Sequence, residues 1–80
     1  KLPVCTAEQG IEIIKNNLTK LNNWKDISLL IPSKFKKNKN LKKTGLAGLF
    51  AGSLELTKEG LITLMQKNSF GKLLIREKND

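Results

Sequence analysis

The C-terminal third of the chain decides the fold: residues 47–60 read AGLFAGSLELTKEG, residues 61–66 read LITLMQ and residues 70–75 read FGKLLI. The first segment has apolar residues at three- and four-residue steps, which predicts a helix over residues 41–58. Gly60 is its expected stop, because glycine readily adopts the left-handed backbone that follows many helices. The next two segments alternate with a period of two and predict an antiparallel hairpin.

A first helix is predicted over residues 6–22. Thr6 and Gln9 have the spacing of a capping box, in which each side chain accepts a hydrogen bond from the other residue's backbone N–H. The apolar residues that follow recur at helical steps and share one face: Ile11, Ile14, Leu18 and Leu21. Asn22 and Asn23 are expected to end this helix.

A short extended piece is expected at Trp24, which we interpret as a core anchor between the first helix and the hairpin. Asp26 can then cap a very short helix over residues 26–31. Pro32 ends it, because the residue before a proline is pushed away from helical angles. Residues 33–40 are polar, unpatterned and basic, and they predict an exposed loop.

The expected order is therefore helix, short strand, helix, helix and hairpin. This order is typical of an α+β winged helix with three helices, a short strand and a C-terminal hairpin wing, in a single domain spanning residues 1–80. The hairpin turn is expected at residues 67–69. In the helix over residues 41–58, the buried face is predicted to centre on Leu46, Phe50, Leu54 and Thr57, flanked by Ala47, Leu49 and Leu56. The expected core is Phe50, Leu54, Ile62, Leu64, Leu73 and Ile75.

Composition argues against an enzyme. The 80 residues include no His and a single cysteine, Cys5, so metal sites of the Cys/His type and His-activated nucleophiles are excluded. Glu55 and Glu59 lie one helical turn apart, but a solvated face explains them better than an acid pair. We therefore predict no catalytic residue, no cofactor and no metal. An unpaired cysteine fits a reducing compartment, so cytoplasm is the expected location.

The chain begins at Lys1 without methionine and is expected to be a fragment of a longer protein. It contains no apolar run of the roughly 20 residues that a membrane-spanning helix needs. The formal net charge is +8, and only Arg76 among the fifteen basic residues is an arginine. The charge therefore has two interpretations: the amino-acid bias of an AT-rich genome, or a nucleic-acid footprint. The candidate phosphate contacts are Lys36, Lys37, Lys39, Lys42 and Lys43.

Placing residues at 100° steps puts a second stripe opposite Leu46 and Phe50. It consists of Thr44, Gly48, Ala51, Gly52, Glu55 and Glu59. Small residues and carboxylates are poor base readers, whereas small residues allow another polypeptide to approach the backbone closely. The alternative is that the two glycines permit close packing inside the domain.

The hairpin offers a second candidate contact surface. Leu61, Met65 and Leu74 are expected on its outward side, close together across the two strands. An exposed apolar patch of this kind often marks an interaction site. The alternative is that the first helix, or a part of the protein outside this chain, covers it.

The segment from Leu46 to Arg76 resembles the C-terminal winged-helix domain of segregation and condensation protein A, the bacterial kleisin. The matching residues are Phe50, Leu54-Glu55-Leu56, Glu59-Gly60, Gln66, Phe70 and Leu73-Leu74-Ile75. Upstream, Trp24 with Asp26 and the apolar run closed by Pro32 resemble the proteobacterial branch. The lysine-rich residues 34–43 and the apolar Leu61 and Met65 depart from the pattern.

This resemblance implies a non-enzymatic, nucleoid-associated subunit of the bacterial SMC condensin complex, acting in chromosome condensation and segregation. In that family the domain docks on the SMC ATPase head, the middle region binds segregation and condensation protein B, and the assembled ring holds DNA. The expected partner-binding residues are Gly48, Ala51, Gly52, Glu55, Leu61, Met65 and Leu74. Two other functions stay open: a DNA-binding winged helix that uses the lysine-rich loop and the wing, and a dimerisation module that pairs through Gly48 and Gly52.

Overall fold

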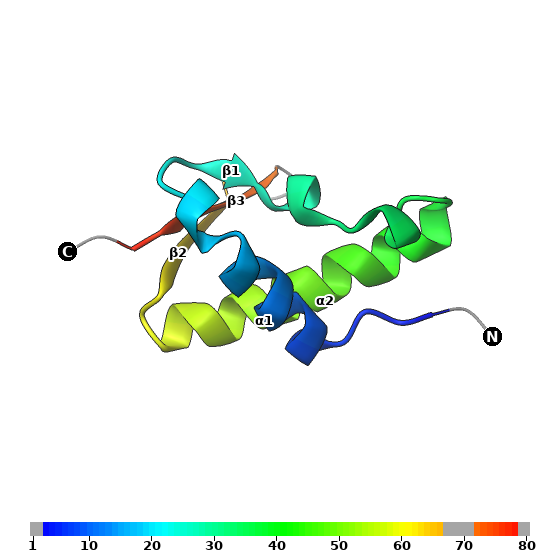
Figure 1. Cartoon of the computed structure of the whole chain (residues 1–80), viewed down its shortest axis with the longest axis horizontal. Helices are drawn as coiled ribbons and strands as arrows, with labels where there is room; N and C mark the ends of the chain where they lie inside the picture. The colour runs from blue at the N-terminus through cyan, green and yellow to red at the C-terminus, as the bar shows by residue number, and fades with distance from the viewer. Residues whose placement is uncertain (1–2, 67–71, 79–80) are drawn as a thin grey trace.

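The computed structural model describes residues 3–66 and 72–78, which fold into two α-helices, three short 3-10 helices and a three-stranded antiparallel sheet (Figure 1). The α+β class is therefore confirmed. Helix α1 packs across α2; the sheet lies toward one end of α2, and the 3-10 helix η3 lies at the other. The elements are α1 (Ala7–Asn16), η1 (Leu18–Lys20), β1 (Lys25–Asp26), η2 (Ile27–Leu30), η3 (Ser33–Phe35), α2 (Lys39–Lys58), β2 (Ile62–Gln66) and β3 (Leu73–Glu77).

Helix α1 begins as predicted and ends early. The Gln9 N–H donates to Thr6 Oγ1 at 3.1 Å and the Thr6 N–H donates to Gln9 Oε1 at 3.0 Å, which completes the capping box. The predicted continuation to residue 22 is wrong, because the backbone tightens at Asn17. Its side-chain amide donates to the Ile13 carbonyl at 2.7 Å and its N–H donates to Ile14, so the next turn is the 3-10 helix η1.

The segment between α1 and α2 has less α-helix than the sequence predicts. Asp26 caps a helix as expected, with its carboxylate accepting from the Ser28 N–H at 2.9 Å, but η2 is a 3-10 helix. The loop expected over residues 33–40 instead contains η3 and the start of α2. Trp24 is 36% exposed, so its prediction as a core anchor is wrong.

Both ends of α2 are fixed by local hydrogen bonds. Asn38 Oδ1 accepts from the Leu41 N–H at 2.9 Å, which starts the helix two residues before the predicted position. At the other end Gly60 has φ of 79°, and the Leu61 N–H donates to the Leu56 carbonyl at 3.0 Å. This positive φ with a six-to-one hydrogen bond is a Schellman motif and confirms Gly60 as the stop.

The sheet has the strand order β1-β3-β2, and Leu64 lies opposite Ile75. The predicted inward face is confirmed: Ile62 and Ile75 are buried, and Leu64 and Leu73 are half-buried against the core. The turn expected at residues 67–69 lies outside the described residues.

The buried face of α2 is not the predicted one. Leu46, Phe50 and Leu54 are 36%, 39% and 42% exposed, and Thr57 is exposed as well. Phe50 and Leu54 are therefore not core residues. Ala47, predicted as a flank of the buried face, is also exposed. The residues that α2 buries are Leu41, Gly45, Gly48, Leu49, Gly52, Ser53 and Leu56.

The crossing of α1 over α2 explains this orientation. A Cβ at Gly52 would lie 2.6 Å from the Ile11 nitrogen, and one at Gly48 would lie 2.5 Å from the Cys5 carbonyl oxygen. A Cβ at Gly10 on α1 would overlap the Gly48 carbonyl. Only glycine fits at such a backbone-to-backbone contact. The predicted alternative, in which the two α2 glycines serve packing inside the domain, is the correct one.

Candidate functional site

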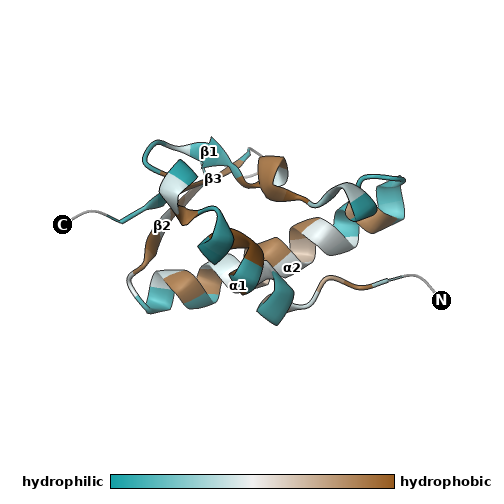
Figure 2. Cartoon of the chain, in the orientation of Figure 1, coloured by the Kyte–Doolittle hydropathy of each residue, from teal (hydrophilic) through white to brown (hydrophobic). Residues whose placement is uncertain are grey.

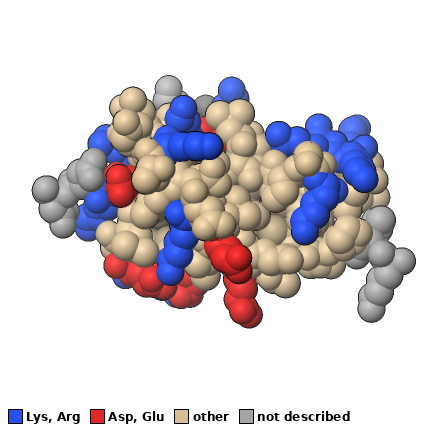
Figure 3. All heavy atoms as spheres, viewed as in Figure 1, with Lys and Arg blue, Asp and Glu red and all other residues tan. Residues whose placement is uncertain are grey.

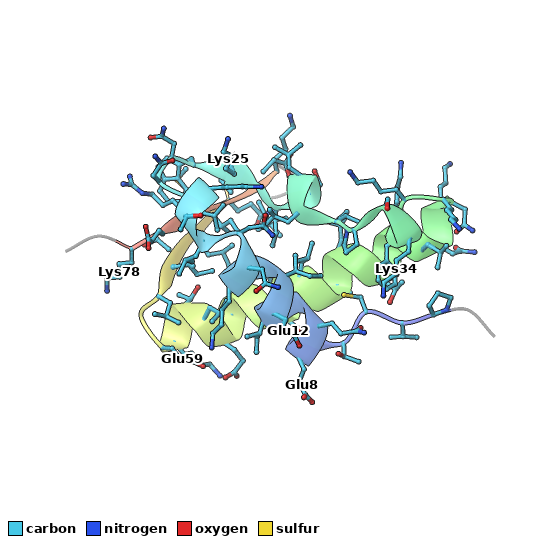
Figure 4. The ribbon with its side chains drawn as sticks, in the orientation of Figure 1. Glu8, Glu12, Lys25, Lys34, Glu59 and Lys78 are labelled. Carbon is cyan, nitrogen blue, oxygen red and sulfur yellow. The ribbon has the colours of Figure 1, made fainter. Side chains whose placement is uncertain are left out.

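The acidic side chains labelled in Figure 4 come from different elements. Glu8 and Glu12 project from α1, whereas Glu59 lies near the end of α2 (Figure 4). Among the described residues no three His, Cys, Asp or Glu side chains are grouped so that they could hold a metal ion. An open hollow of about 360 Å³ between α1 and η3 has Glu12 and Lys34 as its charged lining residues.

Cys5 is the one thiol of the chain, and it is buried in the core. The residue is 4% exposed, and its backbone N–H donates to Thr44 Oγ1 at 3.0 Å. Burial raises the pKa of the Cys5 thiol, and the charge of Lys34 offsets this only in part. A thiol held protonated in an apolar contact is a weak nucleophile, so Cys5 is a packing residue.

The predicted small-residue stripe does not form an exposed surface. Gly48 and Gly52 are buried beneath α1 and Ala51 is half-buried. Glu55 is exposed, and its carboxylate lies 3.6 Å from Lys58 Nζ. The expectation that these four residues present one accessible ridge is therefore wrong, because α1 occupies the ridge.

The accessible face of α2 carries a line of apolar side chains instead. Leu46, Phe50 and Leu54, here called the α2 stripe, follow one another at four-residue steps and point away from α1. Figure 2 shows that the two ends of α2 are hydrophilic, whereas its middle contains most of its apolar residues. Val4, Trp24 and Leu29 are exposed as well, but they do not follow one another along one helix. The α2 stripe is therefore the first candidate interaction site.

A hollow continues the α2 stripe toward the sheet. Leu46, Ile27 and Leu73 line the same open hollow of about 280 Å³, and the rest of its lining is polar: Asp26, Ser28, Gln66 and Lys72. A partner side chain that follows the α2 stripe therefore has a recess at one end of it.

The hairpin patch is present in part. Met65 of β2 lies directly opposite Leu74 of β3, as predicted, and both side chains are half-buried. Leu61 does not belong with them, because it packs against the hydrophobic core. On β3 the Arg76 guanidinium lies over the Trp24 ring, 5.7 Å from its centroid. The outward patch is therefore smaller than expected.

The third candidate surface is a basic end, formed by η3, the following link and the start of α2. Its lysine side chains are all exposed, and Figure 3 shows a cluster of Lys and Arg spheres at this end of the molecule. The predicted phosphate contacts therefore lie together in space, and Lys34 of η3 joins them. The basic end consists of Lys34, Lys36, Lys37, Lys39, Lys42 and Lys43.

No family model matches this chain, and no curated protein matches it. In the part of the chain that the structure describes, none of the helices is long and apolar enough to cross a membrane.

Proposed function

We propose that this domain is the C-terminal winged-helix domain of a bacterial kleisin, and that it docks on the ATPase head of an SMC protein through the α2 stripe. The domain is non-enzymatic and contributes to chromosome condensation and segregation by closing the SMC ring. The sequence resemblance over Leu46 to Arg76 supports this proposal. The element order is compatible with it: β1 follows α1 and η1, and η2 comes directly after β1, where a winged helix has its second helix.

One observation carries the docking surface. Three large apolar side chains of α2 are each more than a third exposed: Leu46 36%, Phe50 39% and Leu54 42%. Burying such side chains against a partner is favourable by roughly 25 cal/mol per Å² of apolar area. Aromatic anchors in a patch without charges are typical of the centre of protein–protein interfaces.

The residues on the accessible face of α2 are unsuited to recognising DNA bases. Base edges in the major groove are recognised by Arg, Lys, Asn or Gln side chains that donate or accept hydrogen bonds. The middle of the accessible face instead presents Leu46, Phe50 and Leu54. A sequence-selective DNA-binding winged helix is therefore the weaker alternative. Dimerisation through Gly48 and Gly52 loses its basis, because α1 and the preceding Cys5 cover the two glycines.

The other kleisin partners belong to the same proposal. Segregation and condensation protein B binds through a middle region outside this chain, and DNA associates through the assembled ring in a cytoplasmic, nucleoid-associated complex.

Capture of the chain by a purified SMC head tests the proposal. The wild-type chain should be retained, and Phe50→Arg should lose most of the retention because it places a charge in the apolar contact. Thr19→Arg adds the same charge at an exposed position of η1 and is the matched control. Equal retention of Phe50→Arg and wild type would reject the α2 stripe. No retention of the folded wild-type chain would reject the proposed function.

A further inference from the structure

The basic end has an excess of positive charge. One of its lysines, Lys34, has its Nζ 5.4 Å from the centroid of the Phe35 ring. No Asp or Glu occurs between Asp26 and Glu55 in the sequence, so the lysines of the basic end have no acidic neighbour along the chain. The ion pair found within the described residues, Lys58 with Glu55, lies near the other end of α2. Across the fold, Glu12 of α1 lines the same open hollow as Lys34 of the basic end. In Figure 3 no red acidic side chain is visible inside the blue cluster at this end of the molecule.

This arrangement does not stabilise the domain. The N-terminal end of an α-helix carries a partial positive charge, which favours acidic side chains in the first turn and disfavours basic ones. The first turn of α2 has no acidic residue and includes Lys39 and Lys42, and Lys43 follows directly. Asn38 supplies the cap through a neutral amide oxygen. Mutual repulsion among six exposed lysines is relieved when a polyanion binds.

The side chains between the lysines favour one kind of polyanion. Phe35 and Leu41 are 1% and 6% exposed, so the apolar residues of this segment are turned into the core. Peripheral membrane binding uses exposed apolar side chains that enter the lipid, and single-stranded nucleic acids are held by exposed aromatic rings. The basic end presents only lysine, asparagine and serine, which are groups that contact phosphates.

We infer that the basic end binds the sugar-phosphate backbone of duplex DNA without reading its bases. The surface supplies cations and small hydrogen-bond donors, and it lacks the bidentate arginines that would select a sequence. The inference does not rest on the proposed docking to an SMC head, because it uses different residues. The lysine-rich segment that departs from the kleisin pattern thereby receives a role of its own.

Fluorescence anisotropy with a short labelled duplex of mixed sequence tests the inference over a range of salt concentrations. The variant Lys36→Gln/Lys37→Gln/Lys42→Gln removes three charges from the basic end. The control Lys15→Gln/Lys20→Gln/Lys25→Gln removes three exposed charges elsewhere, so both variants have the same net charge. Circular dichroism should show that both variants fold, since all six side chains are exposed.

The wild-type chain should bind duplexes of different sequence equally, with an affinity that falls steeply with salt. The basic-end variant should bind about tenfold or more weakly, and the slope of log affinity against log salt should lose about 2 to 3 units, near 0.9 per phosphate contact. The control variant should retain most of the wild-type affinity and most of the wild-type salt slope. Equal losses in the two variants, sequence-selective binding, or tighter binding to single-stranded DNA or phosphatidylserine vesicles would overturn the inference.

Discussion

At the scale of single residues, the glycines of α2 decide which side of the helix faces inward. Gly52 and Gly48 allow α1 to lie against the backbone of α2, and any side chain there would meet backbone atoms. The large residues Phe50 and Leu54 are left on the other side. The two glycines, which have no side chain, thus determine that Phe50 and Leu54 are exposed.

Gly52→Ala should destabilise the domain. Alanine favours a helix over glycine by about 1 kcal/mol, but the new methyl group would lie 2.6 Å from the Ile11 nitrogen and 2.8 Å from the Gly10 carbonyl carbon. Because α1 must move away, we expect a net loss of about 1 to 3 kcal/mol in the free energy of unfolding, measured by urea denaturation. Asn40→Ala, at an exposed position of the same helix, should stay within about 0.5 kcal/mol of wild type. A Gly52→Ala variant more stable than wild type would contradict the close crossing.

The Cys5 thiol should make stability depend on alkaline pH. An unfolded cysteine has a pKa of about 8.5, and burial raises the pKa of Cys5 in the folded chain. The folded state therefore keeps a proton that the unfolded state has released. The contribution of Cys5 is fully present below the unfolded pKa and is lost as pH rises through the folded pKa.

Urea denaturation of wild type and Cys5→Ala across this pH range measures the effect. The difference in unfolding free energy between the two chains should shrink as pH rises from about 8 to 10. Lysines also titrate there, but they are common to both chains and cancel in the difference. A difference that grows with pH would mean that the thiolate is favoured by the fold.

At the scale of elements, the sequence predicts well what is determined locally. The Thr6–Gln9 box, the Asp26 cap and the Gly60 stop all depend on hydrogen bonds between residues a few positions apart. The inward alternation of the hairpin follows from the period of two. The early end of α1 also depends on a local hydrogen bond, which the Asn17 side chain donates to the Ile13 carbonyl. Asparagine at this position could have indicated the end, but the prediction followed the apolar periodicity instead.

The orientation of α2 could not be predicted in the same way, because the helix has two apolar lines. Leu41, Leu49 and Leu56 form one, and Leu46, Phe50 and Leu54 form the other. Helical periodicity does not show which of the two lines is buried. The prediction chose the line with Phe50, whose side chain is the largest, and that line is the exposed one. The choice depends on a long-range contact with Gly10. Gly48 and Gly52, four residues apart on one face, are the sequence signal that indicates where α1 crosses.

Neighbouring residues of α2 test this orientation. Leu49 is fully buried, so Leu49→Ala should lower the free energy of unfolding by about 2 to 5 kcal/mol. Phe50 is 39% exposed, so Phe50→Ala should cost about 1 kcal/mol, although it removes more atoms. Thermal or urea unfolding of the two variants gives the comparison. A larger loss of unfolding free energy for Phe50→Ala than for Leu49→Ala would mean that Phe50 lies on the buried face, as the sequence pattern predicted.

At the scale of the whole molecule, α2 connects two surfaces of different chemistry. Lys39 and Lys43 begin the line on which Leu46, Phe50 and Leu54 follow, so one exposed face changes from basic to apolar along the helix. At 1.5 Å per residue, Lys39 and Phe50 are about 17 Å apart along the axis. The protein contact and the DNA contact that we propose therefore use different parts of one helix.

The docking of the α2 stripe on an SMC head is the central claim, and site-specific photocrosslinking tests it most directly. A benzoylphenylalanine placed at Phe50 preserves the aromatic character of the position, and the same residue at Lys20, exposed on η1, is the control. With a purified SMC head, illumination should give a covalent adduct from position 50 and little from position 20. An adduct from position 20 with none from position 50, from a chain that binds the head, would contradict the claim.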